Sequence, residues 1–177
     1  IKSHVQAGRK AILLYSTISG TAKSLDQAYE RLSEKFPGKV AQVHGSLKSD
    51  AKASALATFA SGECPIMVAT TAIEVGVDVP GIGCMVVVGA DRFGVAQLHQ
   101  LRGRLVRDGG VGDFVMMTDK PPKGATLQRL SAVRDVANGF ELAERDLELR
   151  GFGELLGEAQ AGGVATTLKQ LDLQAID

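Results

Sequence analysis

The sequence predicts an α/β fold in which helices cover both faces of a parallel sheet. Three observations support this prediction: short apolar runs, segments with helical spacing between them, and polar residues where the runs end. The runs are too short for helices and show no polar alternation, which is typical of strands buried on both faces. The expected strands are residues 10–15, 40–43, 66–69, 85–88 and 114–117.

Three segments between these strands are expected to be helices. Residues 22–36 place apolar side chains on one helical face, and the following Pro-Gly pair ends the segment. Residues 49–59 begin with Ser49 and Asp50, which we expect to cap the helix. Residues 93–107 form the third helix.

The pattern changes after residue 118. Residues 120–124 have the composition of a linker, and residues 127–136 then repeat apolar side chains at helical spacing. After a break, residues 140–149 resume a helical pattern, and a last helix is expected near the C-terminus. We therefore predict an α/β domain over residues 1–118 and a helical hairpin with a C-terminal extension over residues 119–177.

Length, charge and composition restrict the possible functions. The 177 residues fit one domain with an appendage, and the formal net charge is zero, so a nucleic-acid contact must be a local patch. No apolar run could span a bilayer and no secretion signal opens the chain, so we expect a cytoplasmic protein without a membrane partner. Cys64 and Cys84 lack metal-ligand spacing, and no metal site is predicted.

Candidate binding residues follow the second and third expected strands. Ligands of parallel sheets bind at the carboxyl ends of the strands. His44 and Gly45 follow one strand, where we expect the glycine to permit a tight turn. Thr70 and Thr71 follow the other, and their hydroxyl and amide groups suit a nucleic-acid phosphate. From spacing alone, two N-capping hydroxyls explain these threonines equally well.

A second candidate site lies in residues 93–107. Gln100, Arg104 and Arg107 recur at helical spacing, with Gly103 beside the first arginine. An amide and two guanidinium groups on one helical face suit planar, multiply charged acceptors such as phosphates. The alternative is a basic helix face that is simply solvated.

Two segments together resemble motifs V and VI of superfamily-2 helicases. Residues 69–80 resemble motif V, and residues 100–107 match the motif VI pattern Gln-x-x-Gly-Arg-x-x-Arg in register. Residues 96–104, 139–143 and 146–157 are similar to RecG branch-migrating helicases, with the transcription-repair coupling factor Mfd as a close second. The resemblance covers almost the whole chain. It implies a second RecA-like helicase lobe over residues 1–118.

The resemblance also assigns roles at a nucleotide site. It implies that Arg107 contacts the γ-phosphate of ATP as an arginine finger. Arg104 would organise phosphate or Asp78, and Gln100 would orient the site. Gly76 lets the backbone turn at the nucleotide cleft, where Asp78 helps to place ribose or a motif VI arginine. ATP with Mg²⁺ would be bound mainly by the first RecA-like lobe, because no Walker A sequence or Asp-Glu-x-His box occurs here.

In the same family, the helical hairpin couples motif VI to translocation on duplex DNA. This assigns residues 119–177 as the translocation motif and its following loop as a coupling element, formed by Arg150, Gly151, Gly153 and Glu154. The implied partners are forked or branched DNA, and the first RecA-like lobe and N-terminal DNA-binding domain of the same parent chain. Alone, this chain is expected not to hydrolyse ATP.

Three substitutions depart from the family pattern. Val106 stands where a glycine is usual between the arginines, Ser46 replaces an arginine, and Phe152 replaces a proline. Three hypotheses are therefore kept. The first is a RecG-type motor lobe that remodels replication forks and Holliday junctions in recombination and repair. The second is an Mfd-type translocase lobe, and the third is a catalytically silent module that binds DNA or protein.

Overall fold

The computed structural model describes residues 1–16, 21–71, 79–105, 112–136, 139 and 141. The chain divides into two compact units, residues 1–122 and residues 123–177, and each is described by itself. The expected helices at 140–149 and near the C-terminus lie almost wholly outside the described residues. The elements are α1 (Lys2–Gln6), β1 (Lys10–Tyr15), α2 (Thr21–Lys35), β2 (Val40–Val43), α3 (Ser49–Ser61), β3 (Ile66–Thr70), β4 (Ile82–Val88), the 3₁₀ turn η1 (Ala90–Arg92), α4 (Val95–Arg102), β5 (Asp113–Met117) and α5 (Gly124–Asp135).

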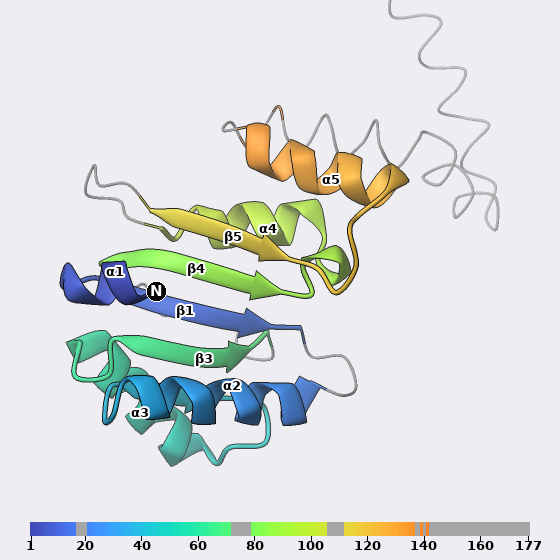
Figure 1. Ribbon diagram of the computed structural model, residues 1–177. Coiled ribbons are helices and arrows are strands. Elements are labelled where there is room, and N and C mark those ends of the chain that lie inside the picture. The colour runs from blue at the N-terminus through green and yellow to red at the C-terminus, as the bar shows by residue number, and fades with distance from the viewer. Residues whose placement is uncertain (17–20, 72–78, 106–111, 137–138, 140, 142–177) are drawn as a thin grey trace, which may run out of the picture. The chain divides into compact units, whose positions relative to one another are not determined.

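Five parallel strands form one sheet in the order β2-β3-β1-β4-β5 (Figure 1). Helix α2 lies in front of this sheet in the figure, and α4 lies behind it. The prediction of a parallel sheet flanked by helices is confirmed. Because every strand runs in the same direction, all the carboxyl ends lie along one edge.

The core of the first unit follows from the apolar runs. Every residue of β3 is buried, and Ile12 and Leu14 of β1 are each 1% exposed. Full burial of such a side chain contributes about 1.5–3 kcal/mol. On one face of the sheet, Leu25 of α2 joins Val40, Ile66 and Val68 in a buried cluster. The helical face predicted for residues 22–36 is therefore the face that covers the sheet.

Strand β4 begins three residues before the predicted start, at Ile82. Gly81 and Gly83 favour a loop by composition, but Gly81 makes the turn into the strand with φ +80°, and its carbonyl accepts the Lys10 amide at 2.8 Å. Gly83 lies under α1, where an added Cβ would come within 2.6 Å of His4 Nδ1. The glycine therefore marks a close approach of the helix to the strand.

Helix α1 is held against the start of the sheet. His4 Nε2 lies 2.8 Å from Asp113 Oδ2, and the His4 side chain is 12% exposed. Ile1 and Val5, one helical turn apart, pack against the apolar clusters of the sheet face. Gly8, with φ +73°, reverses the chain into β1. The position and the direction of α1 are thus fixed by several contacts.

The cap expected for the helix after β2 is wrong. Ser49 is the first residue of α3, and Lys48 occupies the N-cap without a side-chain cap bond. Asp50 lies in the first turn, where a carboxylate interacts favourably with the helix dipole. At the other end, Gly62 adopts the left-handed conformation (φ +84°) and ends α3 two residues beyond the predicted end, at Ser61.

The described part of the second unit consists mainly of α5. Leu130, Ala132 and Val133 are buried, whereas Leu127 is 47% exposed. Arg134 and Asp135 form an exposed ion pair with Nε to Oδ1 at 2.6 Å. The assignment of residues 119–177 as a translocation motif stays a prediction. None of the helices in the described ranges is long and apolar enough to cross a membrane.

The close approach at Gly83 predicts that Gly83→Ala destabilises the chain by about 1–3 kcal/mol, because the side chains of His4 and Arg9 must move away from β4. Urea unfolding followed by far-UV circular dichroism measures this change. Gly103→Ala is the matched control, since Gly103 has right-handed helical dihedrals and an added Cβ would meet no atom nearer than 3.5 Å. That control should leave stability unchanged or raise it by up to about 1 kcal/mol. Equal effects of the two substitutions would contradict the contact.

Candidate functional site

The candidate site is the edge where the five strands end. In strand order, the residues that follow the strands are His44, Thr71, Ser16, Gly89 and Thr118. Strands β2 and β3 are neighbours, and adjacent strands lie about 4.8 Å apart. The two predicted binding loops, after β2 and after β3, are therefore placed side by side.

Thr70 ends β3 with a buried hydroxyl group. The residue is 7% exposed, and its Oγ1 has no hydrogen-bond partner in the described part of the chain. A buried hydroxyl in this state costs about 1–3 kcal/mol. Thr71 is half-buried, and its amide donates to the Tyr15 carbonyl at 3.0 Å, which extends the ladder beyond the strand. The segment that these threonines would cap, residues 72–78, lies outside the described residues.

The loop after β2 forms a turn, with the Leu47 amide donating to the His44 carbonyl at 3.2 Å. His44 is half-buried and Gly45 is exposed. A tight turn is present at Gly45, and Gly45 is not among the glycines with positive φ, so the turn does not need the left-handed conformation. Lys52 Nζ donates to the Gly45 carbonyl at 2.9 Å, which adds a cation that sequence reasoning did not assign to this loop.

Helix α4 ends at Arg102, which corrects the prediction of one helix over residues 93–107. Gly103 is the C-cap, and the next amides bond at i−3: Arg104 to the Leu101 carbonyl and Leu105 to the Arg102 carbonyl, both at 3.1 Å. Gly103 itself keeps right-handed helical dihedrals (φ −63°, ψ −8°), and the hydrogen bonds after it tighten from i−4 to i−3. Arg104 therefore lies beyond the end of α4.

Two other polar side chains of α4 are already engaged. The Gly94 amide donates to Gln97 Oε1 at 3.0 Å, which caps the helix; glycine has no side chain to complete a reciprocal capping box. Arg102 lies 3.1 Å from His99 Nδ1 through Nη2. Because a guanidinium can only donate, His99 accepts at Nδ1, and a neutral ring carries its proton on Nε2.

Gln100 and Arg104 differ from these engaged side chains. Gln100 is exposed and Arg104 is half-buried, and neither side chain hydrogen-bonds to a described residue. The other predicted nucleotide-site residues, Gly76, Asp78 and Arg107, lie outside the described residues. So do the predicted coupling residues, which are Arg150, Gly151, Gly153 and Glu154.

Sequence reasoning missed three polar side chains beyond the ends of β1, β4 and β5, which are Ser16, Arg92 and Asp119. Ser16 follows β1 and is 7% exposed. Gly89, with φ +71°, starts η1 and turns Arg92 back toward the edge, where Nη2 lies 3.2 Å from Asp119 Oδ2. An exposed ion pair of this kind contributes little stability. The Gly-Ala-Asp-Arg sequence directly after a strand is the signal that could have identified it.

Comparison with known proteins shows the family to which the chain belongs. The family of helicase conserved C-terminal domains matches residues 1–109. The helicase Lhr of Mycobacterium smegmatis, solved with single-stranded DNA and AMP-PNP, superposes with a TM-score of 0.58 over 74% of this chain and 17% of that chain. At 20% identity, this likeness concerns the fold alone. The chain belongs to the helicase conserved C-terminal domain family, and its sheet is a RecA-like lobe.

Within that family the sequence is similar to RecG, as predicted. The ATP-dependent DNA helicase RecG of Bacillus subtilis is 41% identical over 92% of this chain and 24% of its own length. RecG of Acidithiobacillus ferridurans is 47% identical over 74% of this chain and 19% of its own length. A solved RecG bound to a three-way DNA junction has a TM-score of 0.70 and 39% identity over 86% of this chain and 20% of that chain. This chain therefore spans about a quarter or less of these relatives.

Because the buried Thr70 hydroxyl has no partner among the described residues, Thr70→Val is expected to raise the free energy of unfolding by about 1 kcal/mol or more, since a methyl group of similar shape replaces the polar group. Thr70→Ser is the control. It keeps the hydroxyl and loses a methyl group, so it should lower stability by about 0.8 kcal/mol. Urea unfolding of both variants checks the prediction, and a Thr70→Val variant less stable than the native chain would show that the hydroxyl is paired.

Proposed function

We propose that this chain is the C-terminal motor lobe of an ATP-dependent duplex-DNA translocase that remodels replication forks and Holliday junctions. The observation that carries the proposal is similarity to RecG over 92% of the chain, at 41% identity. A RecG relative has been solved on a three-way DNA junction, which is a branched DNA of the proposed kind. The activity of the whole protein belongs to the longer parent chain.

The hydrogen-bond donors near the end of α4 support a role in phosphate binding. Gln100 and Arg104 offer an amide and a guanidinium that no described residue occupies. The N–H groups of both side chains can donate hydrogen bonds to anionic oxygens, and the guanidinium adds a positive charge. The described residues include no cluster of His, Cys, Asp and Glu that could hold a metal ion. ATP supplies the γ-phosphoryl group with its Mg²⁺, and we infer that both are bound mainly by the first lobe.

Arginine has a specific task in this arrangement. Charge that develops on a transferring phosphoryl group is stabilised by a positioned guanidinium. Arg107 is proposed as the residue that contacts the γ-phosphate, and Arg104 as the residue that orients phosphate or Asp78. Gly76 would let the backbone turn beside them.

The residues at the ends of β2 and β3 support a role in DNA binding. Thr70 Oγ1 is a buried donor without a described partner, and His44 and Gly45 lie on the neighbouring strand end. Hydroxyl and backbone groups of this kind contact phosphates without reading bases. We propose that the loops after β2 and β3 follow the DNA backbone, and that Arg150, Gly151, Gly153 and Glu154 couple this contact to nucleotide turnover.

The proposal predicts that Arg107→Ala lowers DNA-stimulated ATP turnover of the intact parent by about 10³-fold or more, because the developing charge loses its guanidinium. Steady-state ATP hydrolysis on forked DNA measures the loss. Arg102→Ala is the matched control on the same segment, since Arg102 is held by His99, and it should change kcat by less than about tenfold.

The outcomes separate the hypotheses. An active parent that tolerates Arg107→Ala would show that the arginine assignment is wrong. A parent that never hydrolyses ATP would favour the catalytically silent binding module. A parent that needs only linear duplex and displaces a stalled RNA polymerase would favour the Mfd-type alternative.

The isolated chain gives a second prediction. It should show no DNA-stimulated ATP hydrolysis above a buffer blank, because the Walker A sequence and the acidic box are absent from its sequence. Phosphate release from the purified chain, with forked DNA in excess, measures this directly. Turnover that persists through purification and disappears in Arg107→Ala would overturn the division of roles between the lobes.

A further inference from the structure

Arg92 places a guanidinium at the carboxyl edge of the sheet, beyond the end of β4. It is the last residue of η1, and the first residue of that turn, Ala90, is 0% exposed. Phe93, which follows Arg92, is 4% exposed, so buried side chains fix the backbone on both sides of Arg92. The Arg92 side chain itself is 37% exposed. It therefore presents a positive charge to solvent from a backbone position that is fixed before any ligand binds.

A series of contacts joins this guanidinium to the loops that are proposed to follow DNA. The Thr71 amide donates to the Tyr15 carbonyl at 3.0 Å, which connects the end of β3 to the end of β1. The next residue, Ser16, reaches the end of β4, because a Cβ built on Gly89 would lie 3.6 Å from both Ser16 Oγ and Arg92 Cδ. Thr71 and Arg92 thus follow strands that are two positions apart on one edge, a separation of about 10 Å.

The carboxylate that holds Arg92 binds it weakly. Arg92 Nη2 donates to Asp119 Oδ2 at 3.2 Å, which is longer than the 2.7–2.9 Å or so of a strong charge-assisted hydrogen bond. Among the described residues, the guanidinium makes no other hydrogen bond, so most of its N–H donors are available. The Asp119 side chain is 70% exposed, and an exposed pair of this kind gains little from its charges. An anion that engages more of the donors can therefore displace the carboxylate.

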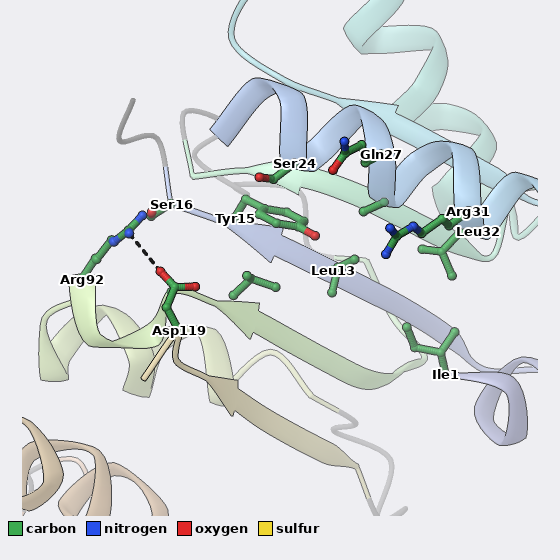
Figure 2. Close-up of a pocket in the computed structure, with 13 residues that line it drawn as sticks. Ile1, Leu13, Tyr15, Ser16, Ser24, Gln27, Arg31, Leu32, Arg92 and Asp119 are labelled. Carbon is green, nitrogen blue, oxygen red and sulfur yellow. Dashed lines mark hydrogen bonds and ion pairs between the residues drawn. The ribbon is translucent and has the colours of Figure 1, made fainter. Parts of the chain in front are cut away.

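The surroundings of Arg92 leave room for such an anion (Figure 2). Arg92 and Asp119 lie at one end of a hollow of about 570 Å³, which Ser16 and Gly89 also line. A phosphate group accepts two parallel hydrogen bonds from a guanidinium, which a single contact to Asp119 does not provide. Duplex DNA carries phosphates about 3.4 Å apart along the axis of each strand. A duplex that lies along this edge can thus present phosphates to Thr71 and to Arg92 together.

We propose that Arg92 is a further DNA-backbone contact of this lobe, and that Asp119 holds its guanidinium until a phosphate replaces the carboxylate. The inference rests on the proposed function, because it extends the same DNA-binding edge from β2 and β3 to β4. The ligand is a backbone phosphate of duplex DNA, and the contact reads no base. Because Arg92 has an anionic partner in both states, the net gain from the contact is small. A contact of this kind is released easily, as each step of a translocase requires.

The test measures how the affinity of the intact parent protein for forked duplex DNA depends on salt concentration. Each phosphate that a cation neutralises contributes about 0.9 to the slope of log K against log salt concentration. Arg92→Gln should therefore reduce this slope by about 0.9 and weaken binding by up to about tenfold at roughly 0.1 M salt. Lys10→Gln is the matched control, because the Lys10 ammonium also contacts an oxygen, the Pro80 carbonyl at 3.1 Å, but lies at the opposite end of the strands. It should leave the slope unchanged.

The role of Asp119 has a separate measurement. Asp119→Asn should strengthen binding by about two- to fivefold, because the phosphate no longer competes with a carboxylate for Arg92. The gain should disappear in the Arg92→Gln background, which a double-mutant cycle measures. Asp113→Asn is the matched control, since the 62% exposed side chain of Asp113 carries the same charge at the opposite end of β5. It should give no gain that depends on Arg92.

Three results would overturn this inference and leave the proposed function in place. One is a parent that binds forked DNA with the same salt slope after Arg92→Gln. Another is a gain from Asp119→Asn that persists without Arg92, which would show a general effect of net charge. The third is an unchanged DNA affinity with a raised KM for ATP in Arg92→Gln, which would assign a nucleotide phosphate to Arg92. A parent that does not bind forked DNA would overturn the proposed function together with the inference.

Discussion

The hydrogen-bond ladder of the central strand β1 is the interaction on which the rest of the structure depends. Its residues pair with β3 on one side and with β4 on the other over the same stretch, so Leu14 lies between Ala69 and Val87. This double pairing places Thr70 and Thr71, at the end of β3, on one side of β1. The segment that leads from β4 to Gln100 and Arg104 lies on the other side. The separation of these two candidate segments is therefore set by the pairing of the strands and not by their own side chains.

The strands were predictable because burial on both faces requires uninterrupted apolar residues, and such runs are visible in sequence. The errors arose where glycine decided the geometry. Gly83 lies within β4 because α1 approaches the strand closely there. Since glycine is more typical of loops, the sequence prediction began this strand three residues too late. At Gly103 side-chain spacing continued the helical pattern, whereas the backbone changed from i−4 to i−3 hydrogen bonds and ended α4. At Gly45 the expected turn forms without positive φ.

The candidate site was predictable to the extent that it follows strand ends. Thr70 and Thr71 were identified in this way, although the burial that leaves the Thr70 hydroxyl unpaired is a property of packing. The Arg92–Asp119 pair was not identified, because it joins residues that approach only after η1 turns the chain. The roles proposed for Arg107 and Asp78 came from resemblance to a family, since spacing cannot distinguish a catalytic guanidinium from a solvated one.

The early end of α4 separates two properties that a longer helix would combine. When an arginine lies within a rigid helix, the same backbone positions the arginine and the buried side chains. A change in the position of the arginine would then also move the core. Arg104 follows the last residue of α4 and is tied to it by the bond from its amide to the Leu101 carbonyl, whereas the buried residues Val95 and Leu98 lie inside the helix. Substitutions in the turn that carries Arg104 therefore need not change the residues that pack in the core. Such a lobe can diverge in its chemistry and its stability along separate evolutionary paths.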